Sequence, residues 1–121
     1  MSKGNERSDA KTEGGLRLHD RRPTPPGRIL QALYMEPRGI SVSALASEVG
    51  RSRKHVSQLV NGHVRLEADM AERLAEVLGT SSDLWLNLQQ AVDRHDARAR
   101  IAESGWQPSR RWHADAVIVE S

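Results

Sequence analysis

The segment GRSRKHVSQLVNG, residues 50–62, constrains the fold of this chain more than any other segment. Its first part holds basic side chains and no acidic one, namely Arg51, Arg53, Lys54 and His55. Val56, Leu59 and Val60 follow at the spacing of one helical face. Cations at the N-terminus of a helix oppose the helix dipole, so this short helix is expected to meet a counter-charge that lies outside it.

Two short helices are predicted to meet at Gly50, where glycine supplies the left-handed backbone of a tight turn. Ser41 caps the first of them, which buries Leu45 and Val49, and Ser52 caps the second. Such a pair is a helix-turn-helix, whose second helix enters the major groove of DNA.

Three further helices complete an all-α domain. Thr24 is expected to cap the first helix, with Pro25 at its first helical position and Pro37 at its end. Its apolar side is predicted to hold Ile29, Leu30, Leu33 and Tyr34. The fourth helix covers 67–78, and a capping box of Thr80 with Asp83 starts the fifth at Leu84.

The two ends differ from this domain in composition. Residues 1–22 are polar and are expected to form a disordered arm, whereas 23–98 form the helical domain. Residues 99–121 form a C-terminal extension with two tryptophans, in which 116–120 (AVIVE) is a candidate strand. The arm either stays disordered, touches the minor groove or folds onto a partner. The extension packs on the fifth helix, pairs with a dimer mate or adds a strand to a partner's sheet.

Composition excludes several functional classes. The chain has no cysteine, and its five histidines are scattered without a zinc-binding spacing, so no metal or other cofactor is expected. No nucleophile with its base, phosphate loop or close carboxylate pair is present, so enzymatic activity is not expected. The sequence shows no signal peptide and no apolar run of the ~20 residues that a membrane span needs. We therefore expect a soluble, cytoplasmic protein.

The predicted second helix of the motif presents four side chains to base edges, namely Arg53, Lys54, Ser57 and Gln58. Arg and Lys recognise guanine, and Gln pairs bidentately with adenine. A second set is expected at the DNA backbone: Ser41, Ser43, Arg51, His55, Asn61, His63 and Arg65. Charge is polarised in the same region, with four Lys or Arg in 51–65 and four acids against one Arg in 66–78. The alternative is a solvated basic face on an ordinary bundle.

Several motifs together resemble the HigA/VapI group of XRE-type (lambda-repressor-like) antitoxins. They are Pro-Gly before the first helix, VSQLVNG, ADMAERLAEVLGTS and WLNLQ, and the resemblance extends from Pro26 to about Asp96. It implies a five-helix domain that dimerises, binds a palindromic operator in its own promoter and represses it. It also implies a partner toxin, usually a small RelE-like endonuclease that cleaves messenger RNA. The base-reading positions implied by the family are the four given above, with Asn61 at the backbone.

Two positions depart from the family pattern. Arg28 stands where relatives usually have Glu, so any salt bridge of that Glu is missing or reversed. Val42 stands where many XRE domains have a phosphate-binding Gln, which leaves the anchoring of that helix to Ser41 or Ser43.

The fifth helix offers a dimer interface. Its apolar belt, Trp85, Leu86, Leu88 and Val92, is wider than docking on one core requires, although such a stripe is commonly core. Two functional hypotheses follow from the sequence. The first is an antitoxin that represses its own promoter and neutralises a toxin, and the second is a stand-alone dimeric repressor without a toxin partner.

Overall fold

The computed structural model describes residues 21–112, and every regular element in this part of the chain is helical. The first helix is built from α2 (Pro26–Ile29), a π-helical segment η2 (Leu30–Met35) and a 3-10 turn η3 (Glu36–Arg38). The others are α3 (Val42–Val49), α4 (Arg53–Val60), α5 (Ala68–Leu78) and α6 (Ser82–Ser104). The predicted all-α fold with five helices is confirmed. The candidate strand 116–120 lies outside the described residues.

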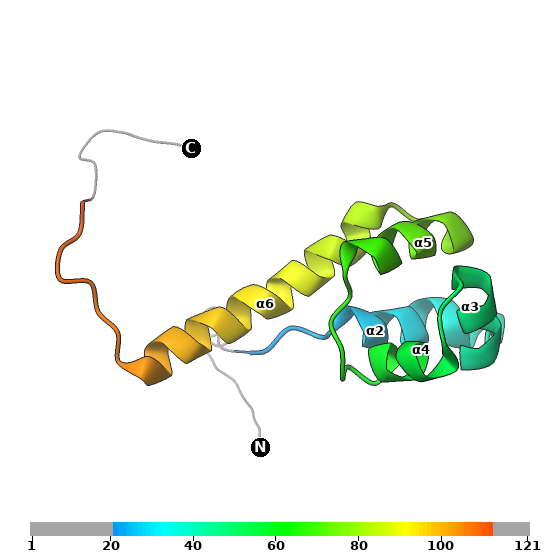
Figure 1. The fold of residues 1–121 in the computed structure, drawn as a ribbon, viewed down its shortest axis with the longest axis horizontal. Coiled ribbons are helices and arrows are strands. Elements are labelled where there is room, and N and C mark those ends of the chain that lie inside the picture. The colour runs from blue at the N-terminus through cyan, green and yellow to red at the C-terminus, as the bar shows by residue number, and fades with distance from the viewer. Residues whose placement is uncertain (1–20, 113–121) are drawn as a thin grey trace, which may run out of the picture.

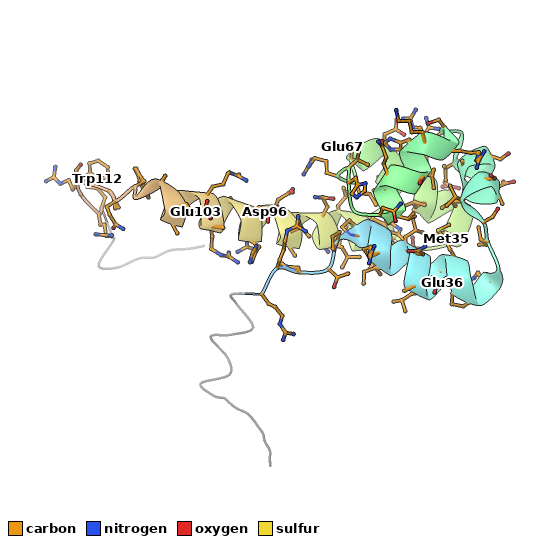
Figure 2. The ribbon with its side chains drawn as sticks, turned by 90° about the horizontal axis from the view of Figure 1, so that it is seen from below. Met35, Glu36, Glu67, Asp96, Glu103 and Trp112 are labelled. Atoms are coloured by element: carbon orange, nitrogen blue, oxygen red, sulfur yellow. The ribbon has the colours of Figure 1, made fainter. Side chains whose placement is uncertain are left out.

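The elements gather at one end of α6. Figure 1 shows α2 beside α4, with α3 next to α4 and α5 packed on the N-terminal part of α6. The C-terminal half of α6 extends away from this body. In Figure 2, Glu67 lies on the body, whereas Glu103 and Trp112 lie at the far end of the helix.

The first helix starts and winds differently from the prediction. Its N-cap is Pro25 rather than Thr24, without a side-chain hydrogen bond, and Pro26 takes the first helical position. The π-helical winding then places Leu30 and Met35, five positions apart, in the core. Leu33, predicted to be buried, is rotated off this face and is 60% exposed.

Close packing of the first helix on α4 depends on Gly27. A Cβ atom added to Gly27 would lie 1.7 Å from the carbonyl oxygen of Leu59, near the end of α4. Because no side chain fits there, the Pro-Gly pair that begins the first helix sets how closely α2 approaches α4.

Trp85 fills the centre of the core. Its ring is fully buried and meets Tyr34 edge to face, with ring centroids 5.3 Å apart. The indole N–H donates a hydrogen bond to Thr80 Oγ1 at 2.8 Å. The predicted capping box is therefore wrong by one residue: Ser81 caps α6 by accepting from the Leu84 amide, because Thr80 is occupied by the indole.

Helix α6 is longer than the predicted fifth helix. It runs unbroken from Ser82 to Ser104, so the predicted domain boundary at residue 98 falls inside it, and Gly105 ends it in the left-handed conformation. None of the helices within 21–112 is long and apolar enough to cross a membrane.

The segment before α2 is tied to the middle of α6. Arg22 donates two hydrogen bonds to Asp96, Nε to Oδ1 at 3.0 Å and Nη2 to Oδ2 at 3.1 Å. The hydrogen bond from Arg22 is the main reason that the pKa of Asp96 falls to about 2. Charge pairing thus fixes where the N-terminal segment leaves the helical body.

Candidate nucleic-acid interface

Helices α3 and α4 form the predicted helix-turn-helix. Ser41 Oγ accepts from the Ala44 amide and Ser52 Oγ accepts from the His55 amide, as a serine N-cap does. Gly50 joins the helices with φ of 71°, in the left-handed region. The two predicted caps and the glycine turn are confirmed.

Helix α4 has one buried side and one exposed side, as the spacing of its residues predicts. Val56, Leu59 and Val60 are buried and hold the helix on the core. Arg53 and Lys54 are exposed in its first turn. Ser57 and Gln58 are half-buried, further along the helix.

Neither cation of the first turn of α4 is neutralised by the rest of the described chain. Within residues 21–112, Arg53 and Lys54 make no salt bridge, although they lie at the positive end of the helix dipole. The five N–H donors of the Arg53 guanidinium and the ammonium group of Lys54 are thus left to water at the helix end that a major groove would receive. This arrangement suits a polyanion.

The positions assigned to the DNA backbone fall into two groups. Five have no acidic partner in the described structure: Ser41, Ser43, His55, Asn61 and His63. The Asn61 side chain donates to the carbonyl of Ser57 at 2.9 Å and so closes the end of α4. Val42, which replaces the usual Gln, is half-buried and packs against the core.

Arg51 and Arg65 form the second group, because the protein itself neutralises them. Arg51 Nη2 lies 2.7 Å from Asp69 Oδ2. Arg65 pairs with Glu67 at 3.0 Å and also with Asp93 of α6. The hydrogen bonds that Arg65 donates to Asp93 and Glu67 raise the pKa of Arg65. A DNA phosphate would have to compete with these carboxylates for either side chain.

A polar relay links α6 to the loop after α4. Gln89 is 7% exposed, and its Oε1 accepts from the Leu66 amide at 2.7 Å. Its Nε2 donates to Asp93 Oδ1 at 2.9 Å, and Asp93 in turn holds Arg65. Sequence reasoning missed this relay, since its partners lie 23 and 28 residues apart and carry no local signal.

The four residues predicted to form a dimer interface differ in their burial within one chain. Trp85 is fully buried and Val92 is 3% exposed within one chain, so both belong to the core rather than to a contact surface. Leu86 and Leu88 are only partly buried. The apolar surface that α6 offers to another chain is therefore narrower than the sequence indicates.

Two further features of the described surface are its carboxylate and histidine side chains and a hollow beside α4. No three His, Cys, Asp or Glu side chains between residues 21 and 112 are grouped so that they could hold a metal ion. An open hollow of about 570 Å³ lies between the start of α4 and the start of α5, with Arg51, His55, Glu67 and Asp69 in its lining.

Comparison with known proteins shows which family has this helix-turn-helix. The helix-turn-helix family HTH_3 matches residues 32–85. Antitoxin HigA-1 of Vibrio cholerae is 44% identical over 88 residues, which cover 73% of this chain and 83% of the relative. The antitoxin GraA in complex with its operator superposes with a TM-score of 0.70 at 33% identity, over 78% of this chain and 95% of that one. Antitoxin HigA of Pseudomonas aeruginosa, solved with the higBA promoter, superposes with a TM-score of 0.67 at 32% identity, over 74% of this chain and 100% of that one.

Proposed function

The chain belongs to the HigA antitoxin family of helix-turn-helix proteins, and from this membership we propose that it is a toxin–antitoxin repressor that binds the operator in its own promoter. The observation that carries the proposal is the first turn of α4, where Arg53 and Lys54 are exposed and unpaired within the described residues at the positive end of a capped helix. Solved relatives with this fold hold operator or promoter DNA.

The proposed DNA contacts follow from the exposure of the side chains. Helix α4 enters the major groove, where Arg53 and Lys54 read guanine and Gln58 reads adenine, with Ser57 beside them. The backbone contacts come from Ser41 and Ser43 at the start of α3, from His55, and from Asn61 and His63 after α4. The Ser41 hydroxyl still has its proton to donate while it accepts from the Ala44 amide.

A palindromic operator calls for two copies of α4. We propose a homodimer in which Leu86 and Leu88 of α6 contribute the apolar contact. Two half-sites one helical turn, about 34–36 Å, apart would then place one α4 in each of two successive major grooves. Replacing both leucines with Ser should weaken dimerisation and operator binding, as followed by analytical ultracentrifugation and a DNA titration.

The antitoxin half of the proposal concerns a protein partner. We propose that the chain binds and neutralises a cognate RelE-like toxin in the cytoplasm, where its operator also lies. The family is one of DNA-binding regulators, which is not an enzyme family. Accordingly, we propose that neutralisation works by binding and that the chain has no catalytic activity.

A growth assay tests the antitoxin role. A small reading frame adjacent to this gene is expressed from an inducible promoter, with and without this protein supplied in trans. The proposal predicts growth arrest that this protein relieves, and co-purification of the two proteins. Absence of arrest, or arrest that persists, would favour the alternative, a stand-alone dimeric repressor.

A promoter reporter tests the repressor role separately. The wild-type protein should repress a reporter fused to its own promoter. The Arg53→Ala variant should not, because it removes a base contact, whereas Arg100→Ala on the distal part of α6 should repress like the wild type. Equal repression by all three proteins would refute the assignment of α4.

A further inference from the structure

One carboxylate joins α5 to the turn of the helix-turn-helix. Asp69, in the first turn of α5, accepts a hydrogen bond from Arg51 at 2.7 Å through Oδ2 and another from Arg73 through Oδ1. Arg51 lies in the turn just before the Ser52 cap of α4. Asp69 therefore sits between an arginine of its own helix and an arginine at the edge of the DNA-binding surface.

Arg73 has a structural role in this group. Its Nη1 donates to the carbonyl oxygen of Val49 at 2.6 Å. That carbonyl belongs to the last turn of α3, where carbonyl groups lack partners within the helix. A cation is also favourable at this negative end of the helix. Arg73 thus holds the end of α3 in place, and its hydrogen bond to Asp69 orients the guanidinium group for this contact.

Arg51 is different, because it donates no side-chain hydrogen bond to the backbone of the described chain. Its side chain is 37% exposed, and within residues 21–112 Asp69 is the only partner of its guanidinium group. Both residues line the open hollow beside the start of α4. An arginine at this position would reach a phosphate if it were free, and each neutralised phosphate adds about 0.9 to the salt slope of binding.

We propose that Asp69 restrains sequence-independent DNA affinity by holding Arg51 in an internal ion pair. Phosphate must displace the Asp69 carboxylate to use this arginine, and doing so costs the attraction between the two charges of the ion pair. Because phosphate contacts carry no sequence information, the restraint acts on operator and non-operator DNA alike. The inference rests on the DNA binding proposed above.

The test is a double-mutant cycle on the full chain. Asp69→Asn removes the charge but keeps an oxygen that accepts from Arg73, so the end of α3 keeps its partner. Fluorescence anisotropy with a duplex of scrambled sequence, repeated over a range of salt concentrations, measures the affinity and the salt slope. Glu72→Gln is the matched control, since it removes the same charge from an exposed position of α5 that has no salt bridge in the described structure.

Asp69→Asn is expected to raise affinity for the scrambled duplex about threefold or more at low salt and to steepen the salt slope by about 0.9. Glu72→Gln should change affinity less than about twofold, as a distant screened charge does. In an Arg51→Gln background, Asp69→Asn should bring no gain, because the arginine that it releases is absent.

The inference would be overturned if Asp69→Asn matched Glu72→Gln, or if its gain persisted without Arg51. These outcomes differ from a failure of the proposed function, in which the wild-type protein would bind neither its own promoter nor the scrambled duplex.

Discussion

Gly27 shows how one missing side chain positions the recognition helix. Gly27→Ala would force its Cβ into the Leu59 carbonyl, which is backbone and cannot rotate away. We expect a loss of about 3 kcal/mol in the free energy of unfolding, the upper range for overpacking. Gly39→Ala is the control, because nothing lies within 4 Å of its added Cβ and only its left-handed φ of 66° adds strain, roughly 1–2 kcal/mol. Equal urea midpoints for the two variants would contradict the close packing of α2 on α4.

A second prediction for a single residue concerns base recognition by Arg53. Arg53→Ala should weaken operator binding by about 1–3 kcal/mol and relax the preference at one base pair, since a bidentate contact to guanine is lost. A titration against operators altered at each position measures both effects. Neutralising Arg65 should instead act on all sequences alike, and only weakly, because Glu67 and Asp93 already pair with it. An Arg53→Ala protein with unchanged operator preference would remove this residue from the base-reading set.

At the scale of elements, Gln89 links α6 to the loop that follows α4. Gln89→Leu would leave the buried Leu66 amide without its acceptor, and we expect a cost of about 1–3 kcal/mol in unfolding free energy. Gln90→Leu, an exposed neighbour on the same helix, should stay within about 0.5 kcal/mol. Urea denaturation of both variants measures the difference. Similar losses of unfolding free energy would mean that Gln89 contributes no more to stability than an exposed residue of the same helix.

The contact between Arg22 and α6 makes a prediction about pH. Asp96 has a folded pKa of about 2, below its ordinary 3.8, because Arg22 binds the charged form. The stabilisation is therefore present above the ordinary pKa and is lost as the pH falls through about 2. Arg22→Gln should return the pKa of Asp96 toward 3.8, whereas Arg21→Gln should leave it low. Carboxyl NMR titration distinguishes these outcomes, and an Asp96 that titrates at 3.8 in the wild type would contradict the pairing.

The elements also show which features a sequence can predict. The caps at Ser41 and Ser52, the turn at Gly50 and the buried side of α4 were predictable, because each depends on residues within one or two turns. The π-helical winding of Leu30–Met35 was not, since it arises from packing that also exposes Leu33. Thr80 was misassigned because three hydroxyl residues, Thr80, Ser81 and Ser82, are consecutive, and the hydrogen bonds of the folded chain show which one caps.

At the scale of the molecule, the charges that matter most were beyond prediction. Asp69 and Asp93 neutralise Arg51 and Arg65 across 18 and 28 residues of sequence, so the basic segment appears more strongly cationic in sequence than it is in the fold. Likewise, the burial of Trp85 and Val92 depends on how α6 lies against α5 and α2. Among the Lys and Arg side chains of segment 51–65, Arg53 and Lys54 at the start of α4 are the two without a salt bridge in the described structure, and we assign sequence recognition to them.

The most direct measurement of that central claim is a DNA titration of the wild-type protein. Fluorescence anisotropy at physiological salt compares a duplex from its own promoter with a scrambled duplex of equal length. We expect operator affinity at least about 10³-fold above that for the scrambled duplex, as specific DNA-binding proteins show. Equal affinity for the two duplexes would contradict sequence recognition by α4, because its exposed Arg53 and Lys54 would then act only as a basic surface.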